Sequence, residues 1–141
     1  MDKNDNFYTM KGYEIKEEDS GKLTTSMEDY LEMIYRIASS GTPIHVGTLS
    51  KRLHVRPSSV TKMIQQLDTA GYIQAEKYGN IDLTDKGREE GRYLFDRHRI
   101  IHSFLCALNH TENELEQAEK IEHFLNKQTV ENLEKLTKAL E

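Results

Sequence analysis

The segment from residue 46 to residue 83 contains the order of elements that most restricts the fold. Apolar residues recur at helical spacing over 46–53 and again over 60–67, which predicts two short amphipathic helices. Between them, Pro57 suits the first position of the second helix, because a first-turn N–H has no intrahelical partner to lose. Two short helices joined by a tight turn are typical of a helix-turn-helix.

A predicted β-hairpin follows this pair of helices directly. Gly71 suits the end of the second helix, and apolar residues alternate with polar ones over 73–75 and 81–83. Between these strands, Gly79-Asn80 favours a tight turn. A helix-turn-helix followed by a two-stranded hairpin is a winged helix, a fold that commonly reads DNA in the major groove.

The charge pattern agrees with a DNA-reading face. The whole chain has a net charge of −5, yet residues 51–80 carry five Lys or Arg residues against Asp68 and Glu76. We expect the DNA contacts to come from the second helix and the wing, at Arg56, Pro57, Ser58, Ser59, Thr61, Lys62, Gln65, Lys77 and Tyr78. The alternative is a winged helix that contacts only another protein.

Helices are predicted on both sides of the winged helix. Ser26-x-x-Asp29 has the form of a capping box at the start of a first helix. Thr84 is expected to cap a long helix that runs to about residue 109, and Thr111-x-x-Glu114 to open the next. A last helix is predicted over about 129–140. These helices expose more apolar surface than one protomer buries easily, so we expect a homodimer.

The predicted fold is therefore mainly α with a small β-hairpin wing. It divides into an N-terminal extension (1–23), a winged helix-turn-helix DNA-binding domain (24–90, its long helix continuing to about 109) and a helical dimerisation domain (91–141). There is no apolar run long enough for a membrane span and no signal peptide, and the single cysteine, Cys106, fits a reducing compartment. We expect a cytoplasmic protein without a membrane partner.

One short acidic stretch suggests a metal site. In a helix, Glu119, Glu122 and His123 would fall within roughly 100° of one another around the axis. Two carboxylates and an imidazole so close together favour a divalent cation, although the pattern alone also fits a solvated acidic face with a chance histidine. In the same way, His98 lies in an apolar row, where a lone histidine is usually a core residue.

Several motifs together resemble the diphtheria-toxin-repressor family, in its manganese-responsive branch. They are S-M-E-D-Y-L-E-x-I-Y (26–35), R-P-S-S-V-T-K-M-I-Q-x-L-D (56–68), E-K-Y (76–78), L-T-D-K-G (83–87), R-H (97–98) and E-x-I-E-H (119–123). The resemblance covers 24–141 and leaves the extension outside. It implies a winged-helix domain followed by a dimerisation domain, without the SH3-like third domain of the iron-dependent branch. Phe124 stands where the family often has a second histidine.

The resemblance also implies a set of metal ligands: Asp29, Glu32, His98, Glu119, Glu122 and His123. In iron-responsive relatives, sulfur residues occupy the places of Asp29 and Glu119. Carboxylates there suit manganese, a hard ion. The family pattern predicts two Mn²⁺ ions per protomer, with Cd²⁺, Co²⁺, Zn²⁺ or Fe²⁺ as surrogates.

The function implied is a manganese-dependent transcriptional repressor. It would bind double-stranded, palindromic operator DNA as a homodimer and control manganese uptake genes. Two alternatives use the same residues. One is a winged-helix regulator that needs no metal; the other is a dinuclear metallohydrolase, disfavoured because the chain has no Gly-rich phosphate loop.

Overall fold

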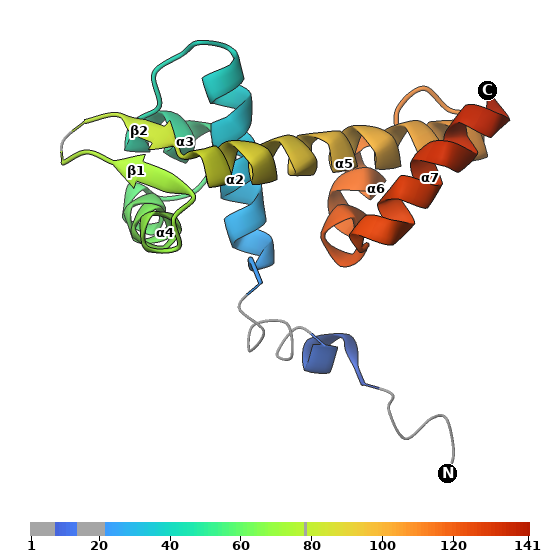
Figure 1. Ribbon diagram of the computed structural model, residues 1–141, viewed down its shortest axis with the longest axis horizontal. Coiled ribbons are helices and arrows are strands. Elements are labelled where there is room, and N and C mark those ends of the chain that lie inside the picture. Colours follow the sequence, from blue (N-terminus) through green and yellow to red (C-terminus); the bar gives the residue numbers. More distant parts are fainter. Residues whose placement is uncertain (1–7, 14–21, 78) are drawn as a thin grey trace.

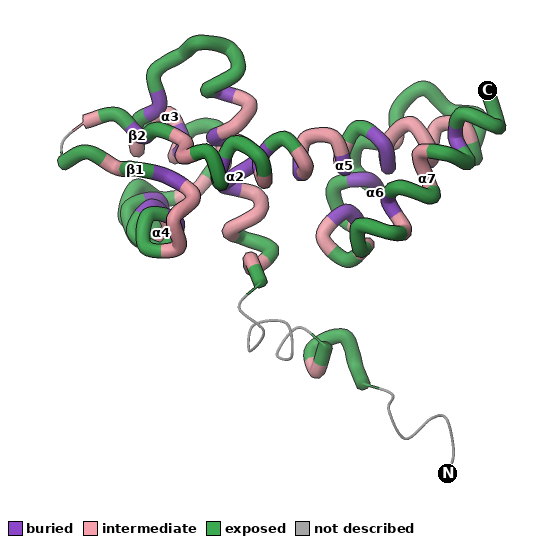
Figure 2. Tube along the Cα trace, viewed as in Figure 1, coloured by how far each residue is buried: buried purple, intermediate pink, exposed green. Residues whose placement is uncertain are grey.

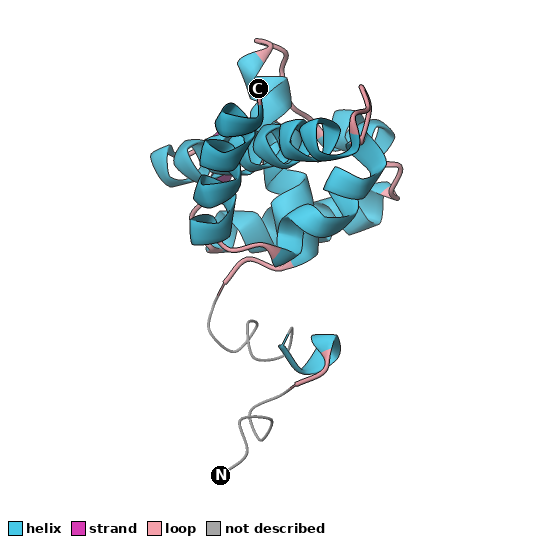
Figure 3. Ribbon diagram, turned by 90° about the vertical axis from the view of Figure 1, so that its right-hand side faces the viewer, coloured by secondary structure: helices cyan, strands magenta, loops and turns pink. Residues whose placement is uncertain are grey.

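The computed structural model describes residues 8–13, 22–77 and 79–141. A long helix, α5 (Asp85–Asn109), runs through the molecule and carries one group of elements at each end (Figure 1). The winged helix surrounds its N-terminal half, and the last helices pack on its C-terminal half. The view turned by 90° shows that helices form nearly all of the structure (Figure 3). The fold is the mainly helical one predicted.

The helix-turn-helix consists of α3 (Val46–Leu53) and α4 (Pro57–Thr69), and α2 (Thr25–Ser39) packs beside both. The predicted helix over 46–53 matches α3 to the residue. His54 ends α3 in the left-handed region (φ 56), and Pro57 occupies the first turn of α4 as expected. The predicted cap of α2 was wrong. Thr24, not Ser26, is the N-cap, and its side chain accepts a hydrogen bond from the Met27 N–H.

The wing is an antiparallel pair, β1 (Ile73–Ala75) and β2 (Ile81–Leu83), in which Gln74 faces Asp82. The strands agree with the alternating pattern, but the expected turn does not. The Gly79 N–H donates to the Glu76 carbonyl at 3.1 Å, so Gly79 ends a turn rather than standing at its centre.

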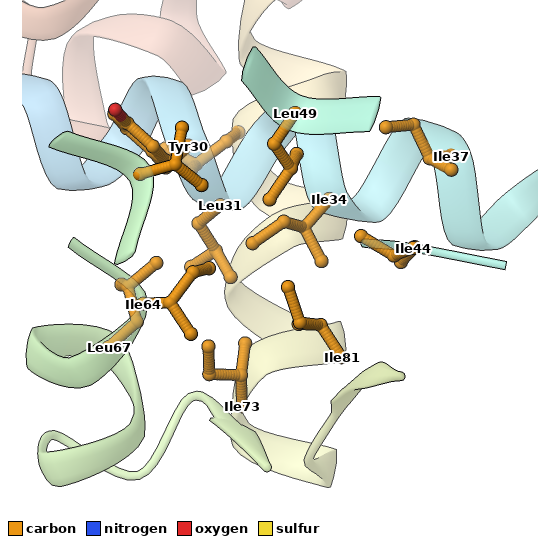
Figure 4. Packing of buried hydrophobic residues seen from close by; sticks show 12 residues of the cluster. Tyr30, Leu31, Ile34, Ile37, Ile44, Leu49, Ile64, Leu67, Ile73 and Ile81 are labelled. Carbon is orange, nitrogen blue, oxygen red and sulfur yellow. The ribbon is translucent and has the colours of Figure 1, made fainter. Parts of the chain in front are cut away.

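The larger hydrophobic core joins α2 to the helix-turn-helix and the wing. Leu31 and Ile34 of α2 point toward Ile64 of α4 and toward Ile73 and Ile81 of the hairpin (Figure 4). All five side chains are buried. Truncating one such residue to alanine typically costs about 2–5 kcal/mol. The first helix is thus a fixed part of the DNA-reading unit, and any residue on it moves with that unit.

Helix α5 begins at the wing. Thr84 is its N-cap, as predicted, and accepts from the Gly87 N–H at 3.1 Å. A Cβ atom at Gly87 would lie 1.8 Å from the Tyr72 carbonyl oxygen, so only glycine lets α5 approach the residue before β1 this closely. Lys86 reaches back to the Ala70 carbonyl at the end of α4. These contacts fix the start of α5 against the recognition helix α4.

The C-terminal end contains α6 (Leu115–Ile121), a 3-10 helix η2 (Glu122–Phe124) and α7 (Lys127–Leu140). Two predictions were wrong here. Thr111 does not cap α6; its hydroxyl contacts the Glu114 side chain, and Glu114 itself is the N-cap. The acidic stretch is not one α-helix either, because α6 ends at Ile121 and the chain tightens into η2.

Burial is uneven along the chain (Figure 2). A second, smaller core holds buried Ile101, Leu105, Ala118 and Val130. Nearby apolar side chains stay exposed, namely those of Leu108, Leu115, Leu136 and Leu140. None of the helices in the described ranges is both long enough and apolar enough to cross a membrane. Most of the extension (residues 1–7 and 14–21) lies outside the described residues.

Candidate metal centre

Four potential ligands meet where α2 faces the C-terminal elements. They are Asp29 of α2, Glu119 of α6, and Glu122 and His123 of η2. One ligand atom from each lies within 4.8 Å of the others. The change from α-helix to 3-10 helix after Ile121 places Glu122 and His123 at this position. Residues from both ends of the molecule thus converge on one small volume.

Glu122 is the buried centre of this group, with 0% of its surface exposed. Its Oε2 atom lies 2.7 Å from Nδ1 of His98, and the same His98 atom lies 3.7 Å from Oε2 of Glu119. Its other oxygen, Oε1, is buried without a hydrogen-bond partner. A buried carboxylate oxygen with no donor is costly unless a cation meets it. His98 is therefore not an ordinary core histidine, because it contacts two of the clustered acids.

His123 uses both ring nitrogens. Nε2 lies 2.8 Å from Oδ1 of Asp29, and Nδ1 lies 2.9 Å from Oε1 of Glu28. Arg97, only 3% exposed, contacts both oxygens of Glu28 at 3.2 and 3.3 Å. Glu28 and Asp29 are neighbours on α2, so the ring of His123 is held against the first turns of that helix.

Glu32 stands apart from the four-residue group. Both Nε and Nη2 of Arg36 contact its Oε2 atom, at 2.9 and 2.8 Å, and the Arg36 guanidinium lies 4.8 Å from the ring centroid of Phe95. The Glu32 side chain is nearly buried, at 11% exposure. Its charge still raises the pKa values of His98 and Glu122, although other causes are larger. Glu32 is thus a neighbour of the cluster whose carboxylate is bound to a cationic side chain.

The electrostatics of the site reflect crowded acids. Burial raises the pKa of Glu122, against the lowering effect of its hydrogen bond with His98. The hydrogen bond to Glu122 raises the pKa of His98, although burial opposes it. Burial lowers the pKa of His123, but hydrogen bonds to Asp29 and Glu28 outweigh this and raise it to about 10. The imidazoles serve as counter-charges for the carboxylates, a role that a bound cation can also fill.

The donor set fits a hard divalent cation. Three carboxylates and one imidazole surround the volume, and no sulfur atom belongs to the group. Oxygen-rich sites of this kind suit manganese and similar hard ions, and borderline metals also bind imidazole and carboxylate. Oε1 of Glu122 provides a further sign that a positive charge belongs there, because this buried atom has no hydrogen bond and meets only Nε2 of His123, at 3.8 Å.

The predicted DNA-contacting residues lie on α4, just before it and on the wing. Those on and before α4 are all exposed, as is Lys77 on the wing: Arg56, Pro57, Ser58, Ser59, Thr61, Lys62 and Gln65. Buried Val60, Ile64 and Leu67 turn the other face of α4 inward. Tyr78 lies outside the described residues. The helix therefore presents a polar, partly cationic face to solvent.

Comparison with known families gives two matches that together span nearly the whole described chain. Residues 22–81 match the iron dependent repressor N-terminal DNA-binding domain, and residues 84–141 match the iron dependent repressor metal-binding and dimerisation domain. The chain belongs to the iron-dependent repressor family. It is accordingly a metal-dependent transcriptional repressor of the diphtheria-toxin-repressor family and not an enzyme, which removes the metallohydrolase alternative.

Curated relatives in this family are similar along most of their length. The HTH-type transcriptional regulator MntR of Lysinibacillus sphaericus is 37% identical over 119 residues, which cover 84% of this chain and 86% of that protein. MntR of Oceanobacillus iheyensis is 40% identical over 111 residues, covering 78% of this chain and 76% of its own.

Solved structures of the family have the same fold. The metal-dependent transcriptional regulator MtsR superposes with a TM-score of 0.72 at 30% identity, and the manganese regulator SloR with 0.70 at 27% identity. ScaR with bound Cd²⁺ superposes with 0.68 at 29% identity. In all three cases the match covers 79% of this chain and 53% of the solved chain, so this chain spans about half the length of those proteins.

Sequence reasoning missed two residues at the site. The sequence showed Glu28 only as part of the S-M-E-D-Y-L-E-x-I-Y motif and Arg97 only as part of the R-H motif. Glu28 contacts Arg97, which is 69 residues away along the chain, and His123, which is 95 residues away. Helical periodicity assigns a residue to a face, but it does not reveal which distant side chain meets that face.

Proposed function

We propose that this protein is a manganese-responsive repressor that binds operator DNA as a homodimer when its metal site is filled. The observation that carries the proposal is the meeting of Asp29 with Glu119, Glu122 and His123. Asp29 belongs to the helix packed into the DNA-reading unit, and the other three belong to the C-terminal elements. Ligands shared between two parts are what a metal-dependent change in DNA affinity requires.

Manganese is proposed over softer metals because of the ligand atoms. Asp29 and Glu119 supply carboxylate oxygen at the positions where sulfur would favour later metals. The names of the similar proteins support this, since SloR is described as a manganese regulator. Cd²⁺, Co²⁺, Zn²⁺ and Fe²⁺ are proposed surrogates, because raw affinity for such ligands does not favour manganese. ScaR, which has been solved with Cd²⁺ and with Zn²⁺, supports such substitution.

We propose two ions per protomer, with Glu119 and Glu122 shared between them. Asp29 and His123 would complete one site, and Glu32 and His98 the other. The contacts of His98 with both Glu119 and Glu122 support this division. Glu32 has to exchange Arg36 for the second ion. The two proposed sites are therefore unequal in this chain, and the Asp29 site is the better prepared.

Bound cations supply positive charge that the carboxylates of both parts can share. Asp29 then holds α2 to η2, and α2 carries the helix-turn-helix with it through the buried core. In a homodimer, this fixes the separation of two recognition helices, so that they match two half-sites of a palindromic operator. The exposed apolar side chains of the C-terminal end are the proposed dimer surface, at Leu108, Leu115, Leu136 and Leu140.

The DNA-reading residues are proposed from exposure and charge. Ser58, Thr61, Lys62 and Gln65 would face the major groove, with Arg56, Pro57 and Ser59 beside the backbone. Lys77 and Tyr78 would reach the backbone or minor groove from the wing.

The test is a DNA selection carried out with and without manganese. The protein is stripped with a chelator, and a random duplex library is enriched in the presence of MnCl₂ or of chelator alone. The proposal predicts an inverted repeat that is enriched only with manganese. The same repeat enriched in chelator would instead support a winged-helix regulator that needs no metal.

A further inference from the structure

We propose that Glu28 and Arg97 are positioning residues for the metal site, which together fix the imidazole of His123 so that Nε2 faces the ion. This inference rests on the proposed function, because it concerns how the same site is prepared. Neither residue belongs to the ligand set considered above. Each is identified by its side-chain contact with His123.

The proton arrangement follows from the chemistry of the three groups. A carboxylate can only accept, so the 2.9 Å contact between Nδ1 of His123 and Oε1 of Glu28 requires an N–H on Nδ1. Nη2 of Arg97 donates to the same oxygen at 3.3 Å. Two donors converging on one oxygen also explain why Nη2 and Nδ1 lie 3.3 Å apart. By the same argument Nε2, 2.8 Å from Oδ1 of Asp29, also carries a proton in the metal-free protein. Because Nδ1 points to the Glu28–Arg97 pair while Nε2 points to the candidate ligand Asp29, Nε2 is the nitrogen that a cation would take in place of its proton.

Arg97 holds Glu28 at two points. Its Nη1 and Nη2 atoms contact Oε2 and Oε1 respectively, and the arginine side chain is 3% exposed while that of Glu28 is 14% exposed. A planar, two-point contact fixes the orientation of a carboxylate, which a lysine cannot do. Water competes little for such a sheltered pair, so Glu28 cannot easily turn away from His123. The Nε atom of Arg97 is buried without a partner, which leaves the guanidinium held from its Nη side.

The arrangement also connects three elements. Glu28 lies on α2, Arg97 on α5 and His123 on η2. Glu28 consequently holds Nδ1 of the imidazole, while Nε2 faces the candidate ligand Asp29. Rotation of the ring would break both contacts together. Groups that orient a ligating histidine through its second nitrogen commonly change metal affinity about 10–100-fold when they are replaced.

A double-mutant cycle tests whether Glu28 acts through His123. Mn²⁺ binding to the full chain is measured by calorimetry for the wild type, Glu28→Gln, His123→Ala and the double variant. We expect Glu28→Gln to weaken binding about 10–100-fold in the wild-type background and less than about 2-fold in the His123→Ala background. Glu89→Gln, which removes an exposed carboxylate from α5, is the matched control and should leave the affinity unchanged.

Two further measurements separate positioning from general stability. Arg97→Lys keeps the charge but loses the two-point contact, so it should weaken Mn²⁺ binding while the metal-free protein still unfolds cooperatively. In Cd²⁺-loaded protein, nitrogen NMR of His123 should place the proton on Nδ1. Wild-type affinity in a folded Glu28→Gln protein, an equal loss in both backgrounds, or a proton on Nε2 would each overturn the inference. If the wild type itself binds no Mn²⁺, the proposed function fails first.

Discussion

The Nε2 atom of His123 lies 2.8 Å from Oδ1 of Asp29, which joins the 3-10 helix η2 to the first turns of α2. One partner belongs to the DNA-reading unit, and the other to the C-terminal elements. A cation bound by Asp29 and His123 would therefore join these two parts and so influence the orientation of the recognition helix α4, which packs on α2.

Replacing Asp29 should separate metal sensing from folding. Asp29→Asn removes one charged ligand, and the side chain is 39% exposed, so the fold should tolerate the change. We expect Mn²⁺ affinity to fall at least about 10-fold and the metal-dependent gain in DNA affinity to disappear. Calorimetry and fluorescence anisotropy with the selected duplex measure the two effects. Asp96→Asn on α5, a partly exposed acid 3.8 Å from Arg99, is the control. A normal metal response in Asp29→Asn would exclude Asp29 as a ligand.

Arg36 should weaken the binding of the second Mn²⁺ ion. Its guanidinium makes two contacts with Glu32, a proposed ligand of the second ion. Its positive charge would also repel a cation bound beside it. Arg36→Met should therefore raise the affinity of the second Mn²⁺ by about 10-fold and leave the first almost unchanged. Calorimetric titration resolves the two binding steps. Arg99→Met, which removes an exposed arginine from α5, should change neither step. Unaltered binding in Arg36→Met would show that Glu32 has no part in a second site.

Lys62 should contribute to DNA affinity without affecting the metal. Its side chain is exposed on α4 and does not belong to the candidate metal centre. Lys62→Ala should weaken binding to the selected duplex and lower the slope of affinity against salt by about one phosphate contact. Mn²⁺ affinity should stay at the wild-type value. Lys135→Ala on α7 provides the control. Unchanged DNA binding in Lys62→Ala would mean that the readout face lies elsewhere.

Glu119 should set the choice of metal. Glu119→Cys replaces a hard oxygen with a soft thiolate in a side chain that is 57% exposed, where a change of size is tolerated. The response should shift toward Zn²⁺, Cd²⁺ or Fe²⁺ relative to Mn²⁺. DNA affinity measured across a series of metals reports the order of preference. A variant that still responds only to manganese contradicts the ligand assignment.

Local sequence patterns predicted much of the fold. The helix over 46–53 was predicted to the residue because Val46 and Leu53, which begin and end its apolar spacing, are also its first and last residues. The first helix cap was misplaced because Thr24 and Ser26 both offer a hydroxyl, and the sequence does not say which one has an extended backbone. The change to a 3-10 helix at Glu122 was missed because the spacing of these residues also fits an α-helix.

The candidate site was less accessible to such reasoning. The pattern E-x-x-E-H marked Glu119, Glu122 and His123, while Asp29, Glu32 and His98 came only from the family resemblance. The structure brings Asp29 to the triplet and places His98 against Glu119 and Glu122, and it binds Glu32 to Arg36 instead. Contacts between helices depend on packing over the whole chain, so Glu28 and Arg97 gave no local indication. That these residues hold manganese stays a prediction.

Anomalous scattering tests the central claim most directly. Crystals of the full chain grown with MnCl₂ are measured on both sides of the manganese absorption edge, and the difference map locates the ion without reference to the protein. The account predicts a peak in contact with Asp29, Glu119, Glu122 and His123. A map with no peak among these four side chains, in crystals that show manganese elsewhere or not at all, would contradict it.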